Sequence, residues 1–131
     1  MLLSSVYARH DRHTLLYRLL EDRDETVNIS HRGMPWYGDH MDFVDSKPYE
    51  AWYFIGEKPY GAIYLSKQNE IGIFLFSQHR GKGIAPRAIK ALMEMHGKRR
   101  YLANINPKNE GSASLFAALG FKLIQHTYES V

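Results

Sequence analysis

The sequence contains no cysteine, which excludes disulfide bonds, thiolate metal sites and a cysteine nucleophile. No apolar run approaches the ~20 residues of a membrane-spanning helix, and no basic leader precedes an apolar core at the N-terminus. The net charge of +3 suits an anionic ligand but is too small to indicate nucleic acid binding by itself. We therefore expect a soluble, cytoplasmic protein that acts neither on membranes nor on nucleic acid.

Metal-binding and phosphate-binding signatures are also missing. The seven histidines are scattered without a His-Glu-x-x-His pattern, and no Gly-x-x-x-x-Gly-Lys-Ser/Thr pattern occurs. The sequence therefore predicts no metal site. At 131 residues and 44% hydrophobic composition, the chain predicts one domain, residues 1–131, with a sizeable core.

Apolar periodicity predicts the order of the elements. Leucines at helical spacing predict an amphipathic helix over 11–22, and two aromatic, β-branched runs at 51–55 and 60–65 predict a hairpin. Residues 23–34 are polar and predict a loop. Further strands are expected at 2–9, 70–76, 101–105 and 121–126, and further helices at 35–44, 84–96 and 110–119. This order indicates an α+β or mixed α/β layer fold.

A glycine-rich segment, Gln78-His79-Arg80-Gly81-Lys82-Gly83-Ile84-Ala85, joins the strand at 70–76 to the helix at 84–96. Its two glycines leave backbone N–H groups uncovered at the positive end of a helix, an arrangement that binds pyrophosphate. Arg80 and Lys82 add positive charge. The alternative is a plain strand-to-helix turn with solvated basic residues.

A second motif follows about thirty residues later: Asn109-x-x-Ser112-x-x-Leu115-Phe116-x-x-x-Gly120-Phe121. In order and separation, the two motifs resemble those of the GNAT superfamily of acyl-CoA-dependent N-acetyltransferases. The detailed match covers residues 70–121. The resemblance implies a splayed, mostly antiparallel sheet flanked by helices. Only eleven residues follow Gly120, so we expect the usual final hairpin to be short or lost.

The resemblance implies acetyl-CoA as cosubstrate, entering where the fourth and fifth strands diverge. Backbone groups near the end of the fourth strand would pair with the pantetheine arm, and the glycine loop would hold the pyrophosphate. Asn109 either contacts this arm or merely caps its helix. The expected cofactor-binding residues are Phe74, Leu75, Phe76, Arg80, Gly81, Lys82, Gly83, Ile84, Asn109, Ser112 and Phe116.

Amine acetylation requires a base, because only a neutral amine attacks the thioester. Glu70, at the start of the fourth strand, is similar in place to the catalytic glutamate of histone acetyltransferases in the superfamily. The alternative is an exposed carboxylate at a strand end. Many relatives have tyrosine where this chain has Phe116, and phenylalanine cannot protonate the departing thiolate. Tyr64, Tyr101 and Tyr128 are the other candidates for that role.

The sequence says least about the residues that would bind the acceptor amine. Trp36, Tyr37 and His40 share the helix expected at 35–44, which corresponds to a substrate-facing region of the family, although a structural histidine is the alternative for His40. Asn104 and Asn106 alternate onto one face of the fifth strand, where either could bond the acetyl carbonyl or the acceptor. The alternative is that they only form hydrogen bonds at the strand end.

The leading hypothesis is an N-acetyltransferase that transfers acetyl from acetyl-CoA to a primary amine, with a small amine or amino sugar favoured. A protein acceptor and a non-catalytic acyl-CoA-binding module are the alternatives. A nucleic-acid-binding domain would rest on Lys98-Arg99-Arg100, which is more typical of a solvated helix end. The sequence leaves a homodimer open.

Overall fold

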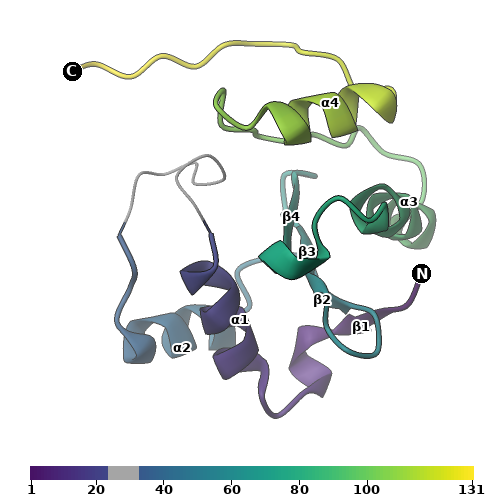
Figure 1. The fold of residues 1–131 in the computed structure, drawn as a ribbon. Coiled ribbons are helices and arrows are strands. Elements are labelled where there is room, and N and C mark those ends of the chain that lie inside the picture. The colour runs from purple at the N-terminus through teal and green to yellow at the C-terminus, as the bar shows by residue number, and fades with distance from the viewer. Residues whose placement is uncertain (24–32) are drawn as a thin grey trace.

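A four-stranded antiparallel sheet forms the centre of the computed structural model, which describes residues 1–23 and 33–131. The strands lie side by side in chain order, β1-β2-β3-β4 (Figure 1). They span Leu3–Ser5 (β1), Ala51–Ile55 (β2), Gly61–Leu65 (β3) and Ile71–Leu75 (β4). Ala51 pairs with Leu65 and Gly61 pairs with Leu75. The predicted hairpin and the strand after it are confirmed.

The helices of the described segments begin and end within two residues of their predicted bounds. They span Arg12–Glu21 (α1), Tyr37–Asp45 (α2), Ile84–His96 (α3) and Glu110–Ala118 (α4), with 3-10 turns at Val6–Ala8 (η1) and Ser77–His79 (η2). Local chemistry explains the agreement. Gly97, at φ 77°, ends α3 in a conformation that favours glycine, and its N–H bonds the carbonyl of Met93 at 3.0 Å.

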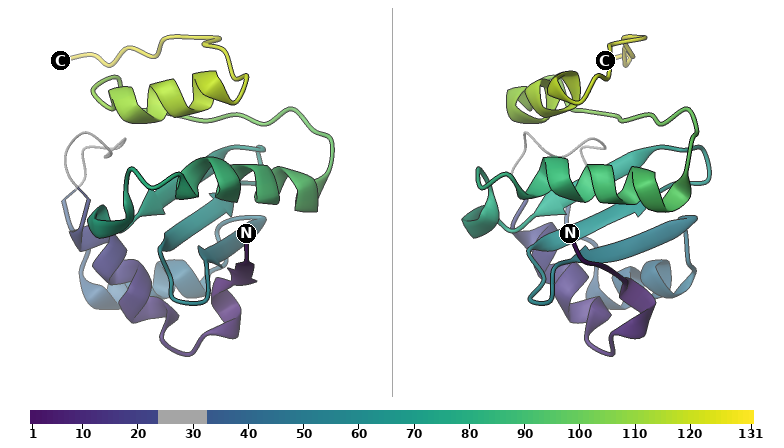
Figure 2. Two further views of the ribbon diagram at one scale, coloured as in Figure 1. Left: turned by 45° about the vertical axis from the view of Figure 1, so that its right-hand side comes forward. Right: turned by 90° about the vertical axis from the view of Figure 1, so that its right-hand side faces the viewer.

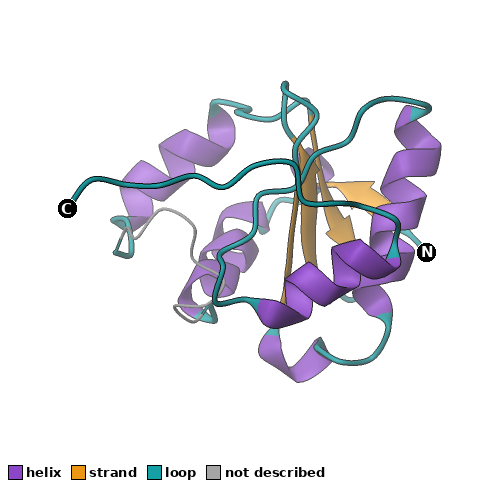
Figure 3. Cartoon of the chain, turned by 90° about the horizontal axis from the view of Figure 1, so that it is seen from above, coloured by secondary structure: helices purple, strands orange, loops and turns teal. Residues whose placement is uncertain are grey.

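Helices cover both faces of the sheet because each strand alternates apolar side chains to either side. Ile63 and Leu65 face α3 and pack in one cluster with Ile89. Phe54 faces the other way and packs in a second cluster with Leu16 of α1. Figure 2 shows α3 on one side and α1 and α2 on the other, and Figure 3 shows the sheet nearly edge-on between helices. Full burial of such side chains contributes roughly 1.5–3 kcal/mol each.

The strand predicted at 101–105 is wrong except at one position. Leu102 forms an isolated parallel bridge with Glu70, in which the N–H of Ile71 donates to the carbonyl of Leu102 at 2.7 Å. The N–H of Leu102 donates to the carbonyl of Asn69 at 2.9 Å. Beyond this bridge the segment leaves β4 and forms no ladder. The result is the splay that the sequence analysis expected at this place.

Two further strand predictions need correction. Residues 121–126 form no strand and run as a loop beside α4 (Figures 1 and 2), because the diverging segment at 103–106 offers them no ladder to extend. The strand predicted at 2–9 ends at Ser5, whose hydroxyl accepts from the N–H of Tyr7 at 3.2 Å and starts the turn η1. Side-chain bonding of this kind competes with strand pairing.

The architecture is therefore a mixed α+β layer fold with an open antiparallel sheet, as the sequence predicts. The predicted loop at 23–34 lies outside the described residues except at its ends. Among the described helices, none has the length and apolar character needed to cross a membrane.

Candidate active site

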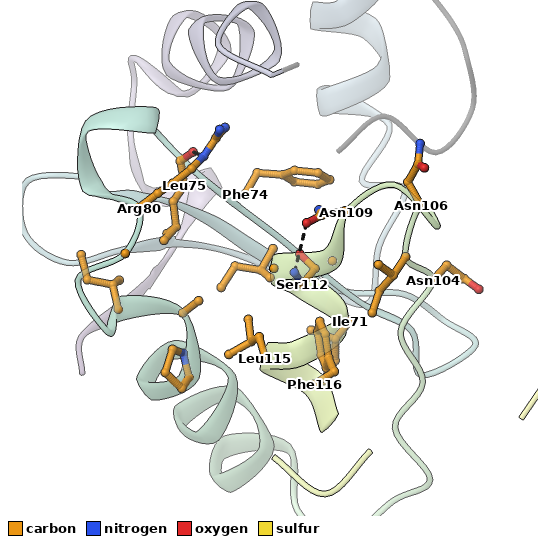
Figure 4. A pocket seen from close by; sticks show the side chains of 18 of the residues that line it. Ile71, Phe74, Leu75, Arg80, Asn104, Asn106, Asn109, Ser112, Leu115 and Phe116 are labelled. Atoms are coloured by element: carbon orange, nitrogen blue, oxygen red, sulfur yellow. Dashed lines mark hydrogen bonds between the residues drawn. The ribbon is translucent and has the colours of Figure 1, made fainter. Parts of the chain in front are cut away.

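A cavity of about 440 Å³ lies along the edge of β4 that faces away from β3 (Figure 4). Its walls come from β4, the glycine loop with the first turn of α3, the segment 104–106 and α4. Ile73 and Leu75 line it from the α3 side of the sheet, and Phe74 and Tyr64 line it from the α1 side. The cavity therefore curves around a strand edge and has access to both faces of the sheet.

Backbone groups of β4 point into this edge. The N–H of Ile71 bonds Leu102 on the outer side, whereas the N–H of Phe76 donates to the carbonyl of Tyr60 in the opposite direction, at 2.9 Å. Because direction alternates along a strand, the backbone groups of Ile73 and Leu75 point outward, where the described segments provide no strand beyond the bridge at Leu102. An extended ligand could pair there.

This alternation changes which residues of the fourth strand can offer backbone groups to a ligand. Leu75 faces the open edge as expected, but the backbone N–H of Phe76 is already bonded to β3, and Phe76 is absent from the lining residues. The side chain of Phe74 lines the cavity, but its backbone groups point towards β3, as those of Phe76 do. The backbone N–H and carbonyl of Ile73 point outward like those of Leu75, and sequence reasoning missed this residue.

The glycine loop forms one end of the cavity. Gly81 and Gly83 have φ of 74° and 75°, and a Cβ added to either would meet no atom within 4 Å. Gly83 is the N-cap of α3 and provides no side-chain cap, so the first N–H groups of the helix are not covered by it. Arg80 and Ile84 line the cavity with these glycines, whereas Lys82 is exposed and does not.

Helix α4 forms the opposite wall. The Oδ1 atom of Asn109 accepts from the N–H of Ser112 at 3.0 Å, which is the predicted helix cap, and both residues line the cavity (Figure 4). Phe116 is 5% exposed, lines the same wall and packs edge-to-face on Phe121 at 5.0 Å. This wall provides an apolar ring where a hydroxyl would be needed to protonate a thiolate.

Glu70 lies at the closed end of the β4 edge. Its carboxylate accepts hydrogen bonds from the Nδ2 of Asn104 and, at 3.2 Å, from the hydroxyl of Ser66. Asn104 and Asn106 line the cavity, whereas Glu70 itself is half-buried just behind Asn104. The predicted base and one predicted acceptor residue are thus direct partners, although 34 positions separate them in the chain.

Helix α2 carries the other three residues that the sequence analysis expected at the acceptor, and none of them lines the cavity. Trp36 is 84% exposed. His40 is buried, with its Nε2 3.2 Å from the carbonyl oxygen of His13 and its ring packed edge-to-face on Tyr17. Tyr37 also packs on Tyr17, with ring centroids 5.0 Å apart.

Burial lowers the pKa of His40 below its usual value near 6.5. The ring is therefore neutral at pH 7. This environment is that of a structural histidine between two helices, which is the alternative that the sequence left open for His40.

A pair of stacked tyrosines adjoins the acceptor side of the cavity. The rings of Tyr49 and Tyr64 lie parallel, with centroids 3.9 Å apart. Gly72 of β4 makes room for them, because a Cβ at Gly72 would overlap the ring of Tyr64. Sequence reasoning missed Tyr49 and Gly72. A glycine inside a β-branched strand signals a close approach of this kind, but it does not say by which ring.

No group of three His, Asp or Glu side chains in residues 1–23 and 33–131 is placed to hold a metal ion.

A family model described as an acetyltransferase (GNAT) domain matches residues 7–122. This range includes β2, β3 and β4, the glycine loop and the whole of α4, and β1 lies before it. Among curated protein sequences, no match is found.

Two solved structures have the same fold. A domain from Methanocaldococcus jannaschii DSM 2661 superposes with a TM-score of 0.81 at 19% identity, covering 98% of this chain and 92% of that one. An N-acetyltransferase from Staphylococcus aureus Mu50 superposes with a TM-score of 0.66 at 21% identity, covering 92% and 81%. At these identities the similarity establishes the fold alone.

Proposed function

The chain belongs to the GNAT acetyltransferase family, and on that premise we propose that it transfers an acetyl group from acetyl-CoA to a primary amine. The observation that carries the proposal is the open edge of β4. This edge runs from the glycine loop, past the outward backbone groups of Leu75 and Ile73, to the Glu70–Asn104 pair. A glycine loop and outward backbone groups therefore line one cavity, and the carboxylate of Glu70 adjoins it through its bond with the lining residue Asn104.

The cosubstrate would be held mainly by backbone groups. The loop at Gly81 and Gly83, with the N-terminus of α3, favours the pyrophosphate through uncovered N–H groups and the helix dipole, and Arg80 adds charge. The amides of the pantetheine arm would pair with the backbone groups of Ile73 and the N–H of Leu75 as an added strand does, since the carbonyl of Leu75 already accepts from Arg80 Nε at 3.3 Å. Ile84 and Phe116 provide apolar walls along this path.

The reaction needs one proton transfer before the attack. The acceptor ammonium loses its proton to Glu70, directly or through water, and the neutral nitrogen forms a bond with the thioester carbonyl carbon. The outward N–H of Ile73 is positioned to stabilise the oxyanion. The intermediate then collapses to the amide and releases the CoA thiolate. Asn104 holds the carboxylate of Glu70 in place through its amide.

For the acceptor, we propose a small amine or amino sugar bound on the α1 and α2 side of the sheet. Support comes from the rings of Tyr64 and Phe74, which line the cavity there, since rings stack on sugars, and from the carboxylate of Glu70 next to the lining residue Asn104, since carboxylates hold ammonium groups. Trp36 and Tyr37 would contact only a larger acceptor that extends beyond the cavity. The cytoplasmic location and the homodimer stay predictions.

One observation favours a non-catalytic acyl-CoA-binding module as the second candidate. Phe116 removes the hydroxyl that many relatives place at this wall. Binding without turnover of any amine would support this candidate.

A thiol-release assay separates the two functions. Purified protein is mixed with acetyl-CoA and a panel of polyamines, amino sugars, nucleotide-linked amino sugars and peptides, with a reaction lacking amine as the control for hydrolysis. We expect amine-dependent release with a free amine or amino sugar. If only peptides react, the acceptor class is wrong, and if acetyl-CoA binds but no amine reacts, the binding module is correct.

A further inference from the structure

A tyrosine hydroxyl reaches the cavity from β3 rather than from α4. Tyr64 lines the cavity, and the other eight tyrosines are not among its lining residues. Its phenol end lies over Gly72, so close that a Cβ at Gly72 would overlap both the ring and the hydroxyl oxygen. Gly72 is flanked by Ile71 and Ile73, whose backbone groups face the open edge. The hydroxyl therefore lies beside the middle of the track.

This ring is held in one orientation. Tyr49 stacks on Tyr64 with an interplanar angle of 6°. On the same face of the sheet, the guanidinium of Arg23 lies 4.0 Å from the centroid of the Phe74 ring. The stacked ring of Tyr49 restricts rotation of the Tyr64 side chain, which favours a reactive group that works without reorganisation.

The hydroxyl remains protonated at neutral pH. Burial raises the pKa of Tyr64 above 10.0, and the nearby carboxylate of Glu70 raises it further, while Arg23 and a hydrogen bond with Tyr49 act in the opposite direction. Burial raises the pKa of Tyr49 as well, so both hydroxyls keep their protons at neutral pH.

The other candidates for a proton donor lie elsewhere. The hydroxyl of Tyr101 donates to the carbonyl of Gly97 at 2.5 Å, at the end of α3 remote from the glycine loop. Tyr128 is 89% exposed. Phe116 occupies the α4 wall without a hydroxyl.

We propose that Tyr64 is a catalytic residue that protonates the sulfur of CoA as the carbon–sulfur bond breaks. The inference rests on the proposed function. The amine nitrogen forms its bond to the carbonyl carbon, the C–S electron pair passes to sulfur, and sulfur takes the phenol proton. The phenolate regains a proton released by the acetylated nitrogen, so the products are the amide and the free thiol. Nothing else is consumed.

The test compares single hydroxyl deletions. Tyr64→Phe should lower kcat by at least ~10-fold. General acid catalysis typically contributes 10²–10⁴-fold, so a larger loss is also consistent with the proposal. The KM for the amine and the thermal shift produced by acetyl-CoA should change little. Tyr128→Phe, the same deletion at an exposed site, should match the wild type. A second variant, Tyr49→Phe, should give a smaller loss of kcat, because it removes only the group that orients Tyr64.

Relocating the hydroxyl gives the decisive comparison. Phe116→Tyr places a phenol on the opposite wall of the same cavity. The double variant with Tyr64→Phe and Phe116→Tyr should therefore recover at least part of the kcat lost in Tyr64→Phe alone. A Tyr64→Phe variant with unchanged kcat and a raised amine KM would overturn the proposal, since Tyr64 would then only bind the acceptor. A wild-type chain that turns over no amine would overturn the proposed function and this inference with it.

Discussion

At the scale of single residues, the polar groups of the site are separated along the length of β4. Glu70 and Asn104 meet at the closed end of the β4 edge, and Tyr64 stands over Gly72 further along the same strand. The glycine loop lies past the other end of β4. If Glu70 is the base and Tyr64 the acid, as we propose, this arrangement suits a direct transfer without a covalent enzyme intermediate.

The role of Glu70 is tested by Glu70→Gln. The amide keeps the size of the side chain but cannot accept the ammonium proton, so turnover should fall by about 10²-fold or more. The acetyl-CoA thermal shift should remain. Steady-state kinetics with the best amine of the panel measure the effect.

Glu50→Gln is the matched control. Glu50 pairs with Arg99 at 2.8 Å, is not among the lining residues and should tolerate the same change without loss of kcat. An effect of Glu70→Gln below threefold would assign the deprotonation to a water chain or to the substrate itself.

At the scale of elements, the pairing of α1 with α2 depends on a buried neutral histidine. His40 lies between Tyr17 and the carbonyl of His13, and its ring is only 4% exposed. The sequence left two interpretations of His40, an acceptor residue and a structural histidine. Because His40 is buried between α1 and α2 and does not line the cavity, we expect its titration to affect folding rather than binding.

A pH series of unfolding experiments checks this role. Because the pKa of His40 is lowered in the folded state, the unfolded state binds the proton more readily below about pH 6.5. Stability should therefore be complete at pH 7.5 and decline as the pH falls towards 5. His40→Gln, which cannot titrate, should show a smaller decline in the free energy of unfolding. Equal slopes for the two proteins would show that His40 is accessible to solvent.

At the scale of the whole molecule, ligand binding should stabilise the fold. A ligand specific for the native state adds about 2.7 kcal/mol at a hundredfold excess over its Kd, so acetyl-CoA should raise the Tm by several degrees. Gly83→Val should abolish this rise, because the side chain would occupy the open space over the loop. Differential scanning fluorimetry with and without acetyl-CoA measures both.

Gly97→Val controls for backbone strain. Gly97 has φ 77°, close to the 75° of Gly83, and nothing lies within 4 Å of its added Cβ, but it ends α3 on the side away from the cavity. This variant should have a lower Tm yet keep the full rise with acetyl-CoA. Retention of the full rise in Gly83→Val would show that the loop does not hold the pyrophosphate.

Features that depend on neighbouring residues can be predicted from the amino-acid sequence. Helical periodicity, the Asn109 cap, the glycine at the end of α3 and the hairpin are encoded within a few positions, and the structure reproduces them. The glycine loop was likewise locatable, because its spacing and flanking elements are local.

Which strand edges and helix faces meet becomes visible only in the folded chain. The segments at 101–105 and 121–126 have the composition of strands, but a strand forms only where a partner provides a ladder, and the chain turns away after Leu102. For the same reason, the sequence could not show that Ile73 faces the open edge, that Asn104 holds Glu70, or that Gly72 brings Tyr64 to the cavity. Each of these contacts joins residues whose proximity depends on strand register and helix packing, and neither is written in any short stretch of sequence.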